Sequence, residues 1–195
     1  MPTEKRLARV KEVASQRQKG LIVVLEDIHD PHNAEAVIRS AEAFGVPEVY
    51  FIFNKEERFN PRRIGKKSSS SGNKWVEFKS FTSPIACVKE LKKKGYTVVA
   101  TALSPNAKEI YAAKLTGKQL ALVFGNEAMG ISEEMRNAAD MLVTIPMRGM
   151  VQSLNLSVTA GIVLYEVTRT RMKKMKQYLL NSREVNALTK RMHIS

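Results

Sequence analysis

The chain has 195 residues, 44% of them hydrophobic, and a formal net charge of +13. This length and composition fit a single folded domain and exclude a disordered chain. The longest aliphatic run, Leu21 to Leu25, is too short to cross a bilayer, and no apolar secretory signal precedes it.

The cysteine and histidine content also restricts the possible functions. A single cysteine, Cys87, excludes an internal disulfide, and histidines at 29, 32 and 193 lack the spacing of zinc ligands. We therefore expect a cytoplasmic protein without a metal site.

Predicted elements alternate along the chain after a basic helix at 3–18. Short aliphatic runs predict buried strands at 21–25, 49–53, 96–102, 120–124 and 141–145. Helical patterns are expected at 34–44, 84–94, 132–139, 155–177 and 183–192, with Asn33 as a candidate cap of the first. This alternation predicts an α/β fold with a parallel sheet, whose ligands bind beyond the carboxyl ends of the strands.

The polar segment 54–74 contains Asn60-Pro61-Arg62-Arg63, Lys66-Lys67 and a serine run. A loop of this length is uncommon inside a compact domain unless it has a function or is disordered. Arg62 and Arg63 are therefore weaker candidates for contacts with an anionic partner.

Positive charge is concentrated at the two ends of the chain. Residues 1–20 hold six Lys or Arg against two acids and residues 168–195 hold eight against one, which leaves +2 for the body between them. A nearly neutral body with basic ends is typical of a folded core with nucleic-acid-binding arms. Solvated tails without a partner remain the alternative. An anionic membrane is disfavoured because the ends lack an aromatic-rich apolar face.

The glycine pattern excludes the common nucleotide folds. No Gly-x-Gly occurs in the chain, so a Rossmann dinucleotide turn is absent. Gly125 and Gly130 have the spacing of P-loop glycines, but Ile131-Ser132 follows them where a Lys-Ser/Thr pair is required.

Three segments combine buried-strand context with polar residues that a core does not need. They are Pro31-His32-Asn33-Ala34-Glu35-Ala36-Val37-Ile38-Arg39, Val123-Phe124-Gly125-Asn126-Glu127-Ala128-Met129-Gly130 and Ile145-Pro146-Met147-Arg148-Gly149-Met150-Val151-Gln152-Ser153-Leu154-Asn155-Leu156-Ser157-Val158. Taken singly, each has an ordinary reading: a cap, a surface ion pair, a polar turn or a helix start.

Together and in order, the three segments resemble the signature motifs of the SPOUT superfamily of RNA methyltransferases, in its TrmH (SpoU) branch. The resemblance covers about residues 20–170. The basic first helix, Ser71-Gly72-Asn73-Lys74-Trp75 and the short basic C-terminal extension are most similar to the members that methylate the ribose of guanosine 18 in tRNA.

The resemblance implies a parallel-sheet SPOUT fold with a C-terminal deep trefoil knot, a topology that pattern reasoning would not propose. It divides the chain into a basic helical arm (1–20), a methyltransferase domain (21–170) and a basic helical extension (171–195). It also implies a homodimer, with active sites formed between two subunits and the long helix in the interface.

The methyl donor of this family is S-adenosylmethionine, bound bent in the knot, largely by main-chain groups. By position in the motifs, these groups come from Thr101, Gly125, Asn126, Ile145 and Leu154. Gly125 would allow close approach of the backbone to the ligand, and the two aliphatic residues would contact adenine.

The catalytic residues implied by the resemblance are Asn33, Arg39, Glu127, Ser153 and Asn155. In the family proposal Arg39 is the base, assisted by Ser153 of the partner subunit. A guanidinium is normally protonated, so Arg39 has an equally physical role in holding a substrate phosphate and stabilising the developing alkoxide. Asn33, Glu127 and Asn155 would be positioning groups.

The expected partner is tRNA, contacted through its phosphates by cations of the two basic ends. The candidates are Arg6, Arg9 and Arg17 at one end and Arg169, Arg171, Lys173 and Lys174 at the other. Two rival functions stay open. One is a ribosomal RNA ribose 2′-O-methyltransferase, disfavoured because only about 20 residues precede the first strand, and the other is a catalytically silent RNA-binding protein on the same fold.

Overall fold

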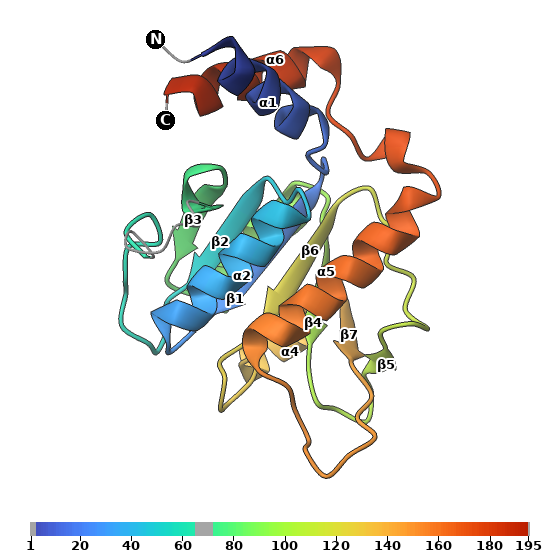
Figure 1. Cartoon of the computed structure of the whole chain (residues 1–195). Helices are drawn as coiled ribbons and strands as arrows, with labels where there is room; N and C mark the ends of the chain where they lie inside the picture. Colours follow the sequence, from blue (N-terminus) through green and yellow to red (C-terminus); the bar gives the residue numbers. More distant parts are fainter. Residues whose placement is uncertain (1–2, 65–71, 195) are drawn as a thin grey trace.

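The computed structural model describes residues 3–64 and 72–194 and shows one parallel sheet with helices on both faces (Figure 1). The sheet has seven strands in the order β3-β2-β1-β6-β4-β7-β5. Their bounds are β1 Leu21–Glu26, β2 Glu48–Ile52, β3 Glu77–Phe81, β4 Thr97–Thr101, β5 Lys108–Glu109, β6 Leu120–Phe124 and β7 Met141–Thr144. The α/β parallel-sheet prediction is therefore confirmed.

The centre of the sheet joins segments that lie far apart in the sequence. Strand β1 pairs in parallel with β2 on one side and with β6 on the other, with Leu21 opposite Leu120 and Leu25 opposite Phe124. All six residues of β1 are buried. A strand covered on both faces has no polar side, which explains its unbroken aliphatic sequence.

Two helices cover each face of the sheet. Helices α2 (Pro31–Ala43) and α5 (Leu156–Met172) pack beside each other on one face, as Figure 1 shows. Helices α3 (Pro84–Lys93) and α4 (Glu133–Ala138) pack on the other face, over a second buried cluster.

The structure corrects several expected boundaries. The cap of α2 is Asp30, whose carboxylate accepts a hydrogen bond from the His32 main-chain nitrogen, and Pro31 occupies the first turn. Asn33 is thus inside the helix, and its side chain is free for another contact. Strands β3 and β5 were not predicted, because β3 is a half-exposed edge strand and β5 has only two residues.

The C-terminal part of the chain also differs from the elements predicted for it. Helix α5 ends at Met172 rather than near 177, and a short 3-10 helix, η2 (Met175–Gln177), follows it. Another short 3-10 helix, η1 (Gly72–Lys74), closes the long polar loop; Ser71 and the Lys66-Lys67 pair of that loop lie outside the described residues.

The two ends of the chain form a helix pair. Helix α1 (Glu4–Ser15) packs against α6 (Ser182–Ile194) through a small cluster that includes Val10, Val185 and Met192. Figure 1 shows this pair at the end of the sheet where β1 begins, so it lies opposite the carboxyl ends of the strands. None of the described helices is long and apolar enough to span a bilayer.

Candidate functional site: a pocket at the carboxyl ends of the strands

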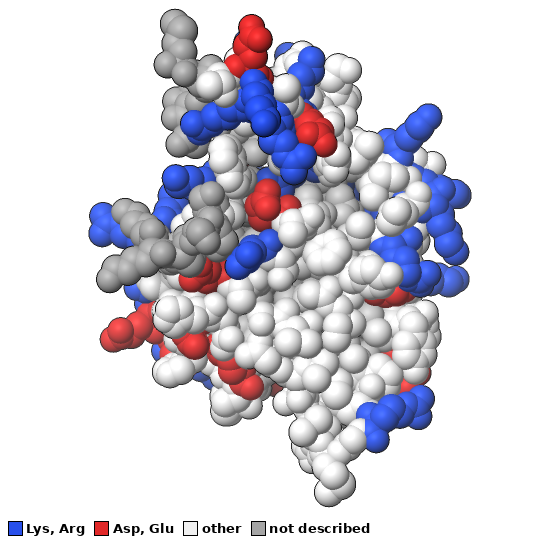
Figure 2. Space-filling view, viewed as in Figure 1, with Lys and Arg blue, Asp and Glu red and all other residues white. Residues whose placement is uncertain are grey.

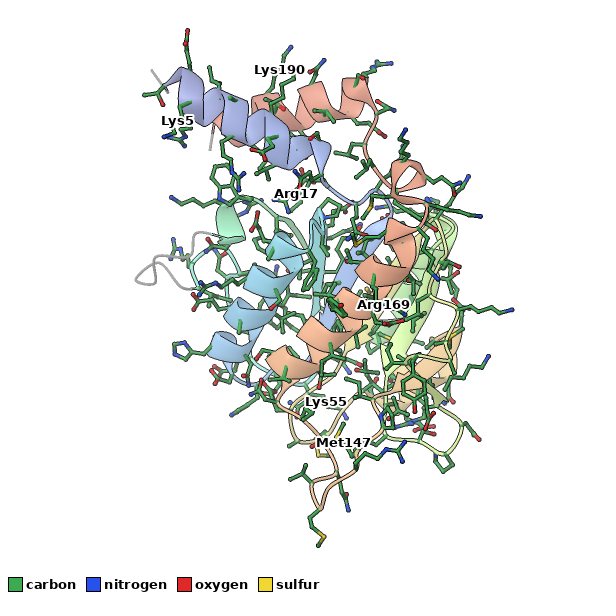
Figure 3. The ribbon with its side chains drawn as sticks, turned by 45° about the vertical axis from the view of Figure 1, so that its right-hand side comes forward. Lys5, Arg17, Lys55, Met147, Arg169 and Lys190 are labelled. Carbon is green, nitrogen blue, oxygen red and sulfur yellow. The ribbon has the colours of Figure 1, made fainter. Side chains whose placement is uncertain are left out.

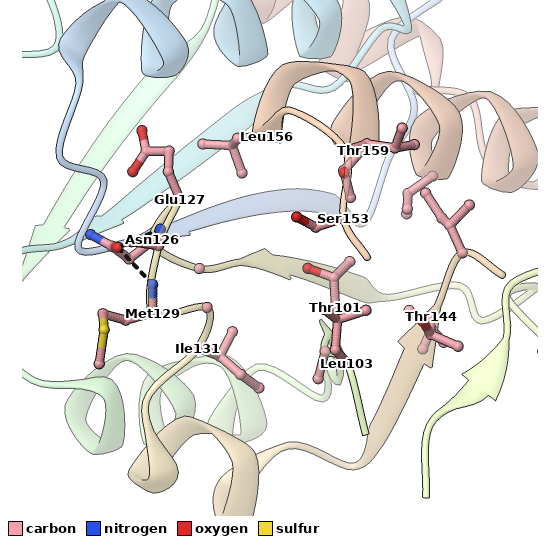
Figure 4. Close-up of a pocket in the computed structure, with 18 of the residues that line it drawn as sticks. Thr101, Leu103, Asn126, Glu127, Met129, Ile131, Thr144, Ser153, Leu156 and Thr159 are labelled. Atoms are coloured by element: carbon pink, nitrogen blue, oxygen red, sulfur yellow. Dashed lines mark hydrogen bonds between the residues drawn. The ribbon is translucent and has the colours of Figure 1, made fainter. Parts of the chain in front are cut away.

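A pocket opens where β4, β6 and β7 end, the place at which parallel α/β sheets bind ligands (Figure 4). Three loops form it: the turn after β6, the segment after β4 and the segment between β7 and α5. The five residues expected to hold the methyl donor all line it, namely Thr101, Gly125, Asn126, Ile145 and Leu154. Their role as donor ligands remains a prediction.

The turn after β6 is held closed by its own backbone. Asn126 and Gly130 exchange two main-chain hydrogen bonds, each of 2.9 Å. A Cβ atom on Gly125 would lie 2.2 Å from the carbonyl carbon of Gly130 and 2.3 Å from the nitrogen of Ile131. The turn itself therefore requires this glycine, and close approach of the Gly125 backbone to a ligand stays a prediction.

The side chain of Asn126 fastens this turn to the neighbouring loop. Its Oδ1 accepts hydrogen bonds from the main-chain nitrogens of Ala128 (2.9 Å) and Met129 (3.0 Å), and its Nδ2 donates to the carbonyl oxygen of Asp27 (2.8 Å). Because its side chain makes these hydrogen bonds, Asn126 presents mainly its main-chain groups to the pocket.

Three of the expected catalytic residues form one hydrogen-bonded chain beside the pocket. The Nδ2 of Asn33 donates to Oε1 of Glu127 (2.9 Å), and the Oδ1 of Asn33 accepts from Nδ2 of Asn155 (3.2 Å). Asn155 also caps α5 through the main-chain nitrogen of Ser157 (2.8 Å). The two hydrogen bonds thus join pairs of residues that lie 94 and 122 positions apart in the sequence.

The other two expected catalytic residues are placed differently. Ser153 lines the pocket and is labelled beside Thr101 in Figure 4. Arg39 is exposed on α2 and does not line the pocket of its own chain. A single chain therefore presents Ser153, but not Arg39, to this pocket.

Two buried carboxylates at the end of β1, neither of them predicted from the sequence, anchor neighbouring loops. Glu26 accepts from Oγ of Ser132 (2.5 Å), the cap of α4, and its burial raises its pKa. Asp27, at a positive φ of 48°, accepts from the main-chain nitrogens of Asn54 (2.7 Å) and Lys55 (2.9 Å). The signal available in the sequence was an acidic pair directly after an aliphatic run.

Much of the pocket lining was not predicted from the sequence, because the predicted site residues were mainly polar side chains and glycine. The additional residues include Leu103, Met129, Ile131, Arg136, Thr144, Met147 and Thr159. Most of these residues come after the end of a strand, and this position was the one signal in the sequence that could have indicated a pocket residue. Among the described residues, no group of three or more His, Cys, Asp or Glu is arranged to hold a metal ion.

The structure corrects two of the expected RNA contacts. Arg17 is 1% exposed and Arg171 is 0% exposed, so a phosphate cannot reach either guanidinium. Figure 3 shows Arg17 between the helix pair and the sheet, where it pairs with Glu42 (2.9 Å). Arg171 donates to the carbonyl oxygen of Gly117 (2.8 Å), lies 4.5 Å from the centre of the Tyr178 ring, and has its pKa lowered to about 10 by burial. Basic character alone could not distinguish these structural arginines from exposed ones.

The remaining basic candidates are exposed, as a contact with RNA requires. They are Arg6 and Arg9 on α1, Arg169 near the end of α5, and Lys173 and Lys174 after it. Figure 2 shows Lys and Arg over the helix pair and at the edge beside the end of α5, while the surface over the loops at the opposite end is mostly uncharged.

Comparison with known proteins gives the family context of the chain. The model of the SpoU rRNA Methylase family matches residues 20–165. The tRNA (guanosine(18)-2′-O)-methyltransferase of Aquifex aeolicus is 38% identical over 88% of this chain and 79% of its own length. The Thermus thermophilus enzyme of the same name is 39% identical over 88% of this chain and 86% of its own.

Solved structures give the same result. The A. aeolicus TrmH/SpoU tRNA modifying enzyme superimposes with a TM-score of 0.85 at 35% identity, covering 98% of this chain and 96% of that one. The SpoU methyltransferase AviRb of Streptomyces viridochromogenes, in complex with the cofactor AdoMet, gives a TM-score of 0.70 at 25% identity and covers 83% and 61%. The chain belongs to the SpoU methylase family of RNA methyltransferases.

Proposed function

We propose that this protein transfers a methyl group from S-adenosylmethionine to the ribose 2′-hydroxyl of guanosine 18 in tRNA, and that it works as a homodimer. The observation that carries the proposal is the pocket after β4, β6 and β7, whose walls hold the motif residues of a family that includes guanosine-18 methyltransferases. The match to those relatives covers 88% of the chain. The superposition on the A. aeolicus TrmH/SpoU tRNA modifying enzyme covers 98% of it, the basic helix pair included.

The pocket residues fit the methyl donor. Ile131, Ile145 and Leu154 offer apolar contacts for a base, while the turn that begins at Gly125 brings main-chain groups to the wall. When bound, S-adenosylmethionine supplies a methyl group already activated by its sulfonium, so the reaction requires no metal ion. The protein has to exclude water, hold the hydroxyl in line with that methyl at about 3–3.5 Å and receive a proton.

The chain from Glu127 through Asn33 to Asn155 supports a positioning role for these three residues. Each side chain in it is oriented by its neighbour, and Asn155 is fixed further because it caps α5. Such preorganised polar groups beside a pocket orient a ribose without having to reorganise during the reaction.

Two observations support the homodimer. The exposed face of α5 carries Val158, Tyr165 and Met172 at intervals of seven residues, an apolar stripe that a second subunit would cover. In addition, Arg39 does not reach the pocket that Ser153 lines. An active site that combines Ser153 of one subunit with Arg39 of its partner would remove this mismatch.

Labelled methyl transfer tests the proposed function. The purified protein is mixed with isotopically labelled S-adenosylmethionine and either an unmodified tRNA transcript or a ribosomal RNA fragment. We expect label in the tRNA, in a dinucleotide that resists alkaline hydrolysis. Label only in the ribosomal fragment would favour the ribosomal alternative, and no label in either RNA would indicate a silent RNA-binding protein.

A further inference from the structure

A second cavity lies at the other end of the sheet from the pocket described above. Its volume is about 520 Å³, and it opens between α6 and the edge at which the strands begin. This volume is within the range of cavities that hold ligands in proteins. Neither the methyl donor nor the methylated ribose of the proposed function occupies this cavity, so its role is a separate question.

The cavity is elongated along the edge of the sheet. Glu77 at the start of β3, Glu48 at the start of β2, Gly20 directly before β1 and Tyr96 directly before β4 all line it. Because the strand order is β3-β2-β1-β6-β4 and neighbouring strands lie about 4.8 Å apart, the starts of β3 and β4 are roughly 19 Å from each other. The cavity is therefore a groove, which we call the α6 groove.

Trp75 supplies an aromatic side chain to the wall of the α6 groove. It is half-buried and packs partly against the apolar cluster of the helix pair. Its main-chain nitrogen donates to the carbonyl oxygen of Gly72 (3.0 Å), and its carbonyl oxygen accepts from Nη2 of Arg17 (3.2 Å). Buried Arg17, labelled in Figure 3, thus anchors the backbone that carries the indole ring.

The α6 groove carries more positive than negative charge. Its lining includes five Lys or Arg and three Glu. The three carboxylates are already engaged within the protein, so they compete little with an anionic ligand for the cations. Their partners are Lys19 for Glu184, Arg191 for Glu77 and the hydroxyl of Tyr50 for Glu48.

Arg62 and Lys74 are the lining cations best placed to bind an anion. Both are exposed, and neither pairs with a carboxylate in the part of the chain that the structure describes. The guanidinium of Arg62 lies 5.6 Å from the centre of the Phe78 ring in β3. A groove with available cations and an aromatic wall is typical of proteins that bind single-stranded nucleic acid.

We propose that the α6 groove binds an unpaired segment of the tRNA, with a base stacked on Trp75 and the adjoining phosphates beside Arg62 and Lys74. The identity of the RNA rests on the proposed function. Bases of an unpaired segment can turn outward and stack on an aromatic side chain, whereas bases inside a duplex cannot. The groove therefore distinguishes unpaired from duplex RNA.

The position of the α6 groove separates this contact from the chemistry. Strand β1 has six residues and is about 20 Å long, and the groove and the first pocket lie at its opposite ends. A nucleotide in the groove is thus not the one whose ribose is methylated. The groove contributes to the recognition of the tRNA and not to methyl transfer itself.

Tryptophan fluorescence tests the proposal directly, because Trp75 is the only tryptophan among the 195 residues. The wild-type protein is titrated with an unmodified tRNA transcript, a single-stranded RNA hexanucleotide and a blunt RNA duplex. Anisotropy of end-labelled RNA reports binding independently of Trp75. The variant R62A/K74A removes the two available cations, and K89A/K93A is its matched control, since Lys89 and Lys93 are exposed lysines of α3.

We expect the tRNA and the hexanucleotide to quench the emission of Trp75 and the duplex to leave it unchanged. R62A/K74A should weaken tRNA binding on the order of 10-fold and raise the KM for tRNA at an unchanged kcat, because it removes phosphate contacts remote from the reacting atoms. K89A/K93A should follow the wild type. Both variants change exposed side chains only, so both should fold as the wild type does.

Unchanged Trp75 emission when anisotropy shows saturated tRNA binding would overturn the proposal. Equal quenching by the duplex and the hexanucleotide would also overturn it, as would equal losses of affinity in R62A/K74A and K89A/K93A. The titrations contain no methyl donor. Their outcome is therefore separate from failure of the proposed function, in which the wild-type protein transfers no labelled methyl group to tRNA.

Discussion

Asn33 and Glu127 lie 94 residues apart in the sequence, yet the amide nitrogen of Asn33 is 2.9 Å from the carboxylate of Glu127. Asn33 is available for this contact because Asp30, and not Asn33, caps α2. The contact joins the first turn of α2 to the turn after β6, and the strands before them, β1 and β6, pair at the centre of the sheet. It is therefore the most direct link between the sheet and the chemistry of the site.

N33D tests this link. The substitution keeps the size of the side chain but places a second carboxylate beside Glu127, so the two groups repel each other. We expect methyl transfer to fall on the order of 100-fold, because the polar chain no longer holds its arrangement. The control is N137D, since Asn137 donates to Glu133 at 3.3 Å on the exposed surface of α4. Equal losses in the two variants would show that the position of Asn33 has no special importance.

G125A tests the packing of the turn after β6. Its Cβ would meet the backbone at 2.2 Å, which no side-chain movement relieves. We expect a loss of about 1–3 kcal/mol in the free energy of unfolding and weaker binding of S-adenosylmethionine. Thermal unfolding and calorimetry provide these measurements. G117A is the matched control, because its nearest atom would lie 3.6 Å away; a G125A protein as stable and as tightly binding as G117A would refute the account.

Buried Arg171 and the exposed lysines that follow it should behave in opposite ways. R171A leaves the Gly117 carbonyl without its donor and opens a cavity beside Tyr178, so we expect it to cost about 3 kcal/mol of unfolding free energy. Alanine at exposed Lys173 and Lys174 should leave stability unchanged. This double variant should also bind tRNA with a weaker dependence on salt. The slope of the logarithm of the binding constant against the logarithm of the salt concentration should become less negative by about 0.7–0.9 for each lost phosphate contact. A salt slope that stays at the wild-type value would exclude these lysines as phosphate contacts.

Mixing two inactive variants tests whether the active site is shared between subunits. R39A and S153A should each be inactive as homodimers. If Arg39 of one subunit serves the pocket that contains Ser153 of its partner, each mixed dimer has one intact site, and a fully exchanged equal mixture regains about a quarter of wild-type activity. No recovery in a mixture shown to contain mixed dimers would place both residues in the same subunit's site.

The sequence predicted the central strands because burial on both faces leaves an unbroken aliphatic run, as in β1 and β6. It missed β3, whose half-exposed side chains alternate less clearly, and the two-residue β5. Local sequence patterns identify continuous buried strands more readily than short strands at the edge of a sheet.

Site residues that belong to sequence motifs could be predicted, whereas features that depend on tertiary contacts could not. All five expected donor residues line the pocket, but no local pattern shows that Arg17 and Arg171 are buried while Arg169 is exposed. The anchoring roles of Glu26 and Asp27 depend on partners at Ser132 and Asn54, which only the folded chain brings near.

The central claim, methyl transfer to the ribose of guanosine 18, is tested most directly with two tRNA substrates that each lack one 2′-hydroxyl. One substrate carries 2′-deoxyguanosine at position 18, and the other carries a 2′-deoxynucleotide at position 19. With labelled S-adenosylmethionine, the account predicts that the first substrate takes up no label and that the second is labelled like the unmodified transcript. Label in the tRNA that has no hydroxyl at position 18 would contradict it.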